Sequence, residues 1–204
     1  MKDINATVIV DLIPEESEIY NNLPRDAKRG IKKAINDKLV VEPSNNDDEW
    51  KEFYHIYKNT IISGGSNFES LEELKKNTHI FFTCKKDGKI IAGAGIFFKE
   101  LYNFKIPRLY FNASLKEYQD SYPNNLLYWN CIIWSKKNRY KEFDLGGWQI
   151  NARDHLRGVN EFKEKWGKIV YYKKDYQFLR AIGRKLIRSS GFFWWLNKKL
   201  RGRT

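Results

Sequence analysis

The chain is poor in the residues on which metal centres, disulfides and nucleophilic enzymes depend. Of its 204 residues, two are cysteine, three are histidine and one is methionine. His55, His79 and His155 lack the spacing of zinc ligands, so we expect no metal site. No serine or cysteine stands in a nucleophile-elbow motif, which argues against a catalytic triad. Cys84 and Cys131 fall in a predicted strand and a predicted apolar helix, where we expect two buried thiols.

Long apolar runs are also absent. No stretch of about 18 apolar residues occurs, so the sequence predicts no transmembrane helix. Residues Met1–Asn5 lack the apolar core of a signal peptide, and we therefore expect a cytoplasmic protein. The length of 204 residues gives room for one domain with a sizeable core and hardly for two. The hydrophobic fraction of 42% and the seven tryptophans predict a packed rather than a disordered protein.

Positive charge is in excess and unevenly distributed. The formal net charge is +12. From Lys168 to Thr204, eleven lysines and arginines face the single acid Asp175, a net charge of +10, while the first 167 residues carry +2. Such a segment favours an anionic partner, which is a nucleic acid, a nucleotide-linked substrate or an acidic membrane surface. A basic face that only keeps the protein soluble is the alternative.

The charge excess is concentrated in a tail over residues 177–204. Apolar residues follow helical spacing up to Leu186, and Phe192 to Leu196 then places four aromatic residues beside lysines and arginines. Aromatic rings flanked by cations are typical of a helix at a membrane interface. We expect Phe192–Arg203 to contact an anionic membrane surface. The alternative is a C-terminal helix that docks its aromatic side chains on the core.

Hydrophobic periodicity and turn signals predict alternating strands and helices before this tail. Strands are expected at 6–12, 79–83, 89–98, 108–114, 143–145 and 169–172, with a tight turn at 87–88. Helices are expected after Pro24, from 50 to the glycines at 64–65, after a capping box at Ser70, over 126–134 and over 159–166. This order is compatible with one mixed sheet flanked by helices.

The most informative stretch is FDLGG at 143–147, followed by GVNEFKEKWG at 158–167. A short apolar strand ends in two glycines, where the backbone can turn or approach a ligand closely. The periodicity then predicts a short helix that buries Val159, Phe162 and Trp166. This order leaves Lys163 near the rim of whatever the strand end opens onto.

These stretches resemble the signature "fDlGG … gi..FK..fGg" of the Fem-type aminoacyltransferases, a branch of the GNAT acyltransferases. Further segments match in the family's order: TVIVDL at 7–12 with the helix at 23–34, FYHIYKNT at 53–60, GKIIAG at 88–93, YFNAS at 110–114 and PNNLLYW at 123–129. The resemblance implies an α/β fold, with one GNAT-like domain over 1–176 and a mixed, mainly antiparallel sheet. A basic C-terminal helix over 177–204 follows it. Typical bridge-forming members have two such domains, and this chain has room for one.

The family's activity implies an N-acyltransferase. The acyl group would come from aminoacyl-tRNA or another acyl donor and pass to the amino group of a nucleotide- or lipid-linked cell-envelope precursor, at the cytoplasmic face of the membrane. Such a reaction relies on proximity and backbone N–H donors and needs no cofactor. The segment at 115–125, where acetyl-CoA users carry a glycine-rich loop, contains no glycine and two acids. This argues against ordinary CoA binding, although acyl-CoA and acyl-carrier protein stay open as donors.

The resemblance also assigns site residues. Phe162 and Lys163 match the pair associated with the acyl donor and the transition state, and a solvated lysine is the alternative for Lys163. Asp144 either orients the incoming amine or accepts a hydrogen bond in the turn, and the neighbouring glycines favour the turn. Trp148 and Gln149 are expected to line the pocket beyond the strand end.

Two further expectations concern binding. The first predicted helix carries a basic face suited to acceptor phosphates, or simply a charged solvent face, made of Arg25, Lys28, Arg29, Lys32 and Lys33. The alternative function is a non-catalytic module of the same fold that binds RNA or anionic lipid. The two functions differ in one structural requirement, since only a transferase needs an open cleft lined by Gly146, Gly147, Phe162 and Lys163.

Overall fold

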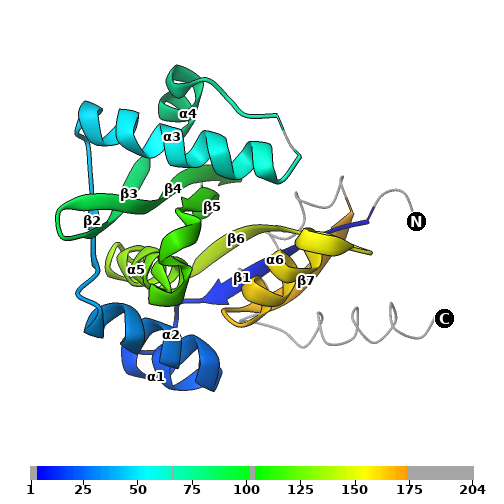
Figure 1. The fold of residues 1–204 in the computed structure, drawn as a ribbon. Coiled ribbons are helices and arrows are strands. Elements are labelled where there is room, and N and C mark those ends of the chain that lie inside the picture. Colours follow the sequence, from blue (N-terminus) through cyan, green and yellow to red (C-terminus); the bar gives the residue numbers. More distant parts are fainter. Residues whose placement is uncertain (1–3, 66, 102–103, 174–204) are drawn as a thin grey trace, which may run out of the picture.

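The computed structural model describes residues 4–65, 67–101 and 104–173. In chain order its elements are β1 (Ile4–Asp11), α1 (Glu16–Asn22), α2 (Arg25–Asn36), β2 (Val40–Pro43), α3 (Asp47–Ser63), α4 (Leu71–Asn77), β3 (Ile80–Lys86), β4 (Lys89–Leu101), β5 (Phe104–Ser114), the 3-10 helix η1 (Lys116–Ser121), α5 (Pro123–Lys137), β6 (Glu142–Trp148), α6 (Asp154–Glu164) and β7 (Lys168–Lys173). The seven strands form one sheet in the order β2-β3-β4-β5-β6-β1-β7 (Figure 1).

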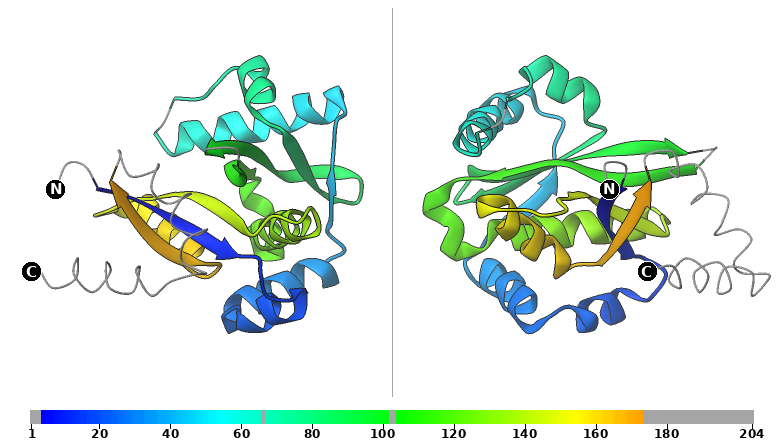
Figure 2. Two further views of the ribbon diagram at one scale, coloured as in Figure 1. Left: turned by 180° about the vertical axis from the view of Figure 1, so that it is seen from behind. Right: turned by 90° about the vertical axis from the view of Figure 1, so that its right-hand side faces the viewer.

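Neighbouring strands of the sheet are antiparallel, with one exception. The strands β5 and β6 run parallel, and their registered pairing is a single pair, Arg108 with Asp144. The helices α3 and α4 cover one face of the sheet, and α1, α2 and α5 cover the other (Figures 1 and 2). The helix α6 lies on the α5 side next to β6. The predicted mixed, mainly antiparallel sheet with flanking helices is confirmed.

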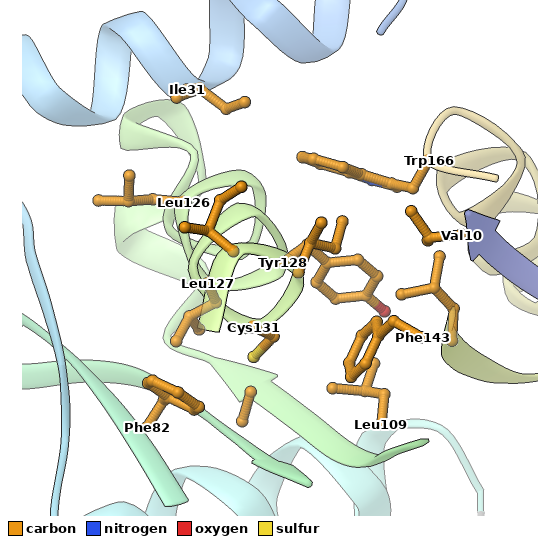
Figure 3. Close-up of a cluster of buried hydrophobic side chains, with 14 of the residues drawn as sticks. Val10, Ile31, Phe82, Leu109, Leu126, Leu127, Tyr128, Cys131, Phe143 and Trp166 are labelled. Atoms are coloured by element: carbon orange, nitrogen blue, oxygen red, sulfur yellow. The ribbon is translucent and has the colours of Figure 1, made fainter. Parts of the chain in front are cut away.

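Each face of the sheet has its own hydrophobic core. On the α5 side, Tyr128 packs with Phe143 and Trp166, all at most 4% exposed (Figure 3). On the α3 side, Phe53 packs against Phe81 and Phe111 of the sheet. Burying a large apolar side chain contributes roughly 1.5–3 kcal/mol, so both layers hold the sheet between them.

Local signals account for several elements as predicted. Ser70 caps α4 in a reciprocal capping box with Glu73. Asp87 and Gly88 both have positive φ, 49° and 80°, as a tight turn between antiparallel strands requires. The two cysteines are free and buried, as expected, and burial raises the pKa of the Cys84 thiol to about 12. None of the described helices combines the length and the hydropathy needed to cross a bilayer.

Several elements differ from the sequence-based expectation. The helix α1 was not predicted, because it has no side-chain N-cap and buries only Ile19. The helix with the basic face, predicted as the first, is therefore the second one, α2. The prediction that α6 buries Val159 is wrong, since Val159 is 42% exposed. The helix instead buries Asn160, which is 4% exposed. A polar residue on the buried face interrupts the hydrophobic repeat by which the sequence would reveal that face. Trp166 is buried but lies beyond the end of α6. The proposed tail over 177–204 lies outside the described residues.

Candidate active site

The strands β5 and β6 each carry a bulge at the point where they separate. Leu109 and Phe111 of β5 pair with adjacent residues of β4, so Tyr110 is the extra residue. A register shift between β6 and β1 leaves one extra residue in β6 between Asp144 and Gly147. A bulge bends its strand and re-aims side chains. The two bulges lie just beyond the Arg108–Asp144 pair, and the strands diverge from there.

A cavity of about 340 Å³ lies in this opening. Its walls combine aromatic rings, two cations and strand backbone. The lining residues are Phe97, Arg108, Leu109, Tyr110, Phe111, Asn112, Leu145, Gly146, Gly147 and Lys163. An opening between two strands that should otherwise be hydrogen-bonded leaves backbone groups available to a ligand.

Gly146 is required at the floor of the cavity. Its φ of +82° is in the left-handed region, where other residues are strained. A Cβ at this position would lie 3.4 Å from the Leu109 carbonyl oxygen and 3.6 Å from Lys163 Nζ. A Cβ on the adjacent Gly147 would meet nothing within 4 Å. The two glycines therefore differ in what they can tolerate.

Asp144 holds the turn of β6. Its Oδ1 accepts hydrogen bonds from the Gly146 backbone N–H, at 2.8 Å, and from the Thr7 hydroxyl. Its Oδ2 lies 3.6 Å from Arg108 Nη1. Asp144 is 5% exposed and is not among the residues that line the cavity. The contact to the turn matches the second of the two roles considered for this residue.

Lys163 extends from α6 to the end of β6. Its Nζ donates a hydrogen bond to the Gly147 carbonyl oxygen at 2.9 Å. Burial lowers the pKa of Lys163 to about 8, and the charge of Arg108 lowers it further, while Asp144 opposes the shift. At neutral pH the Lys163 side chain is mainly a cation, and it lines the cavity. Because the site is largely buried, this charge interacts more strongly with nearby groups than it would in water.

Comparisons with known proteins identify the architecture. No protein-family model and no curated protein sequence matches the chain. Its structure is similar to that of FemX, with a TM-score of 0.70 and 15% identity over 83% of this chain and 60% of that one. It is also similar to L-PGS from Bacillus licheniformis, with a TM-score of 0.57 and 14% identity over 85% and 62% of the two chains. The chain has the GNAT fold.

The GNAT fold also extends to an aminoglycoside acetyltransferase, meta-AAC0020, from an uncultured soil metagenomic sample. That match has a TM-score of 0.50 and 15% identity, and it covers 63% of this chain and 86% of the other. Against FemX and L-PGS the chain spans about three fifths of the partner's length.

Some residues predicted for the site lie beside the GNAT-fold cavity rather than in its wall. Phe162 packs edge-on against Tyr128, with ring centroids 5.0 Å apart, in the core below α6. The Trp148 indole N–H donates to the Glu164 carboxylate at 2.7 Å. The Gln149 backbone N–H donates to the Asn160 side-chain oxygen, and the Asn160 amide donates to the Gln149 carbonyl oxygen. The aromatic walls are instead Phe97, Tyr110 and Phe111.

The basic residues of α2 lie apart from the cavity. The helix packs on α5, on the side away from α3, and none of its residues lines the cavity (Figure 1). Lys28 donates to the Asn21 carbonyl oxygen and Lys33 pairs with Asp37. Arg25, Arg29 and Lys32 are exposed.

The segment at 115–125 does not form a phosphate loop of the glycine-rich kind. It contains η1, and Tyr122 takes the left-handed conformation just before α5 begins. In the first turns of α5, the Asn124 amide donates to the Ser114 hydroxyl and the Tyr128 hydroxyl donates to the Asn112 side-chain oxygen, which ties the helix to β5. Within the described part of the chain, no group of three or more histidine, cysteine, aspartate or glutamate side chains is placed to hold a metal ion.

Arg108, Tyr110 and Phe97 line the cavity, although no sequence pattern predicted them there. Tyr110 begins the YFNAS segment, but its place in the wall depends on the bulge in β5. Arg108 reaches the site because β5 pairs with β6 at that residue. Pairings between distant strands leave no local sequence signal.

The electrostatics of the cavity can be tested on Lys163. Replacing Arg108 by Gln removes a like charge, so the pKa of Lys163 should rise above about 8. NMR titration of the lysine side chains measures this shift. The control is Arg157→Gln, since Arg157 pairs with Glu161 on the exposed side of α6. An unchanged pKa in Arg108→Gln would show that the two cations do not share the cavity.

Proposed function

We propose that the chain is an N-acyltransferase that uses the opening between β5 and β6 as its reaction site. The observation that carries this proposal is the cavity between the two bulged strands, with Lys163 at its floor. The fold shared with FemX and L-PGS supports it. A module that only binds RNA or lipid has no need of an open, cation-lined gap inside its sheet.

We propose separate tasks for the residues of the site. The acyl carbonyl lies between the β5 bulge at Tyr110 and the turn at Gly146, where backbone N–H groups and a cation can stabilise a developing oxyanion. Lys163 supplies that cation. Asp144 and Phe162 act as positioning residues, since Asp144 holds the turn and Phe162 anchors α6 on the core. The amine attacks from the open side of the cavity, and holding both reactants together lowers the barrier.

The preferred donor is aminoacyl-tRNA, and acyl-CoA or acyl-carrier protein is the alternative. The motif resemblance to the Fem-type branch supports the first. The glycine-free segment at 115–125, with η1 in place of a phosphate loop, supports it as well. We propose an amine-bearing, nucleotide- or lipid-linked envelope precursor, of peptidoglycan or surface-polysaccharide type, as acceptor. The exposed cations of α2, Arg25, Arg29 and Lys32, are proposed to meet its phosphates.

The donor can be identified by a parallel incubation. Labelled aminoacyl-tRNA, acyl-CoA and acyl-carrier protein are each mixed with the protein and with a lysine-containing peptide or glucosamine as amine. We expect label to move to the amine from aminoacyl-tRNA. Transfer from one of the other donors keeps the enzyme class and changes the donor. Salt-dependent RNA binding without transfer from any donor would favour the binding module instead.

The same assay tests Lys163. Lys163→Ala should lower the rate at least about tenfold, since a loss of about 1.4 kcal/mol of transition-state stabilisation gives that factor. Lys165→Ala is the matched control, because Lys165 lies on the same segment but pairs with Asp26 of α2. Equal rates in the two variants would show that Lys163 does not stabilise the transition state.

Two glycines outside each other's reach offer a second test with a control. Gly146→Val should abolish transfer, because valine is strained at the positive φ of this position and would project toward Leu109 and Lys163. Gly158→Val, on α6, should retain most of the activity, since a Cβ there meets nothing within 4 Å and Gly158 does not line the cavity. Circular dichroism verifies that both variants fold. A folded, fully active Gly146→Val protein would show that chemistry occurs elsewhere.

Membrane contact is a separate proposal that rests on the sequence of the tail. Each cation near an anionic surface adds on the order of 1 kcal/mol, and the aromatic run adds apolar area. Deleting residues 191–204 should release the protein from anionic vesicles in a sedimentation assay and leave its thermal unfolding unchanged. Continued sedimentation would place the contact elsewhere, and unfolding would place the aromatic side chains in the core.

A further inference from the structure

A carboxylate lies directly behind the aromatic wall of the cavity. Tyr110 lines the cavity, and its hydroxyl donates to both oxygens of the Glu69 carboxylate at 2.6 Å. Glu69 stands in the connection between α3 and α4, the helices that cover this face of the sheet. The pair therefore links the cavity to an acid group that no sequence motif indicated.

Two further hydrogen bonds are made beside this pair. The Tyr54 hydroxyl of α3 donates to the Glu69 backbone carbonyl at 3.0 Å. The Asn77 amide of α4 donates to the Tyr110 oxygen at 3.2 Å. A phenolic oxygen has two lone pairs, so Tyr110 can donate to Glu69, accept from Asn77 and still accept from a donor in the cavity.

The other ionisable groups at the cavity are less suited to accept a proton. Asp144 is 5% exposed and occupied by the turn and by Thr7. Lys163 and Arg108 are cations that favour negative charge. Desolvation, together with the hydrogen bond to Glu69, raises the pKa of Tyr110 to about 12. Tyr110 alone is therefore protonated near neutral pH and can take up a proton only as it passes its own to Glu69.

We propose that Glu69 is the proton acceptor of the reaction, acting through the Tyr110 hydroxyl, and this rests on the acyl transfer proposed above. The Tyr110 oxygen takes one proton from the ammonium form of the acceptor while the Tyr110 proton moves to Glu69. The free amine nitrogen then bonds to the acyl carbon, and the bond from that carbon to the leaving oxygen or sulfur breaks. A second proton of the nitrogen passes to the leaving group, and Glu69 returns its proton to solvent. Tyr110 is then a catalytic residue.

The conservative variant Glu69→Gln separates this role from a structural one. Its amide oxygen still accepts the Tyr110 hydroxyl, but the amide cannot take up a proton. Tyr110→Phe removes the relay, and Tyr54→Phe is the control that removes only the bond to the Glu69 backbone. The titratable groups beside the pair are Tyr54 and Tyr57 of α3, and both remain in Glu69→Gln. The charge of Arg108 lies one ring farther away, over Phe97, which contacts Tyr110, and it also remains.

The rate of transfer is measured from pH 6 to about 10, with the donor found above and a lysine-containing peptide or glucosamine, whichever accepts. At pH 7 the rate of Glu69→Gln and of Tyr110→Phe should fall about a hundredfold, and that of Tyr54→Phe less than twofold. The deficit of Glu69→Gln should shrink as pH approaches the pKa of the amine, about 10.4 for lysine, because more of the acceptor is then deprotonated without help.

Three outcomes would overturn the proposal. A rate of Glu69→Gln within twofold of wild type at pH 7 removes Glu69 from the reaction. A deficit that is constant across the pH range, or equal in Tyr54→Phe, assigns the pair to holding the α3–α4 connection. Wild-type protein that transfers nothing from any donor overturns the proposed function itself, and the proton relay with it.

Discussion

The carboxylate of Asp144 ties together the three strands that define the site. It accepts from Thr7 of β1 and from the backbone of Gly146 in β6, and it faces the Arg108 guanidinium of β5. A buried carboxylate needs such partners, and a hydrogen bond to a charged group contributes about 1.5–3 kcal/mol. The registered pairing of β5 with β6 is this one residue pair, Arg108 with Asp144, and the cavity lies beyond it.

The rest of the cavity depends on this junction. The turn that Asp144 holds gives Gly146 its positive φ and presents the Gly147 carbonyl oxygen to Lys163. On the opposite strand the bulge turns Tyr110 toward the α3 side, where Glu69 meets it. The cavity therefore has a cationic end at α6 and an acid-linked end at the α3–α4 connection. Those two ends suit a developing negative oxygen and a nitrogen that loses a proton.

Sequence patterns predicted the parts of the fold that local interactions decide. The capping box at Ser70 and the turn at Asp87 and Gly88 depend on neighbouring residues, so their signals are present in the sequence. The polar inward face of α6 and the short helix α1 were not predicted, because neither has a hydrophobic period in the sequence. In the site, the glycine pair and Lys163 stood out as a local motif. Arg108, Tyr110 and Glu69 did not, because strand register and a bulge bring them together.

A structure of the protein with a non-reactive, amide-linked analogue of its acyl donor tests the central claim most directly. The acyl carbon should lie between Tyr110 and Gly146, with its carbonyl oxygen within hydrogen-bonding distance of Lys163 Nζ. An analogue bound away from this opening, for example on the exposed face of α2, would contradict the claim that the gap between β5 and β6 is the reaction site.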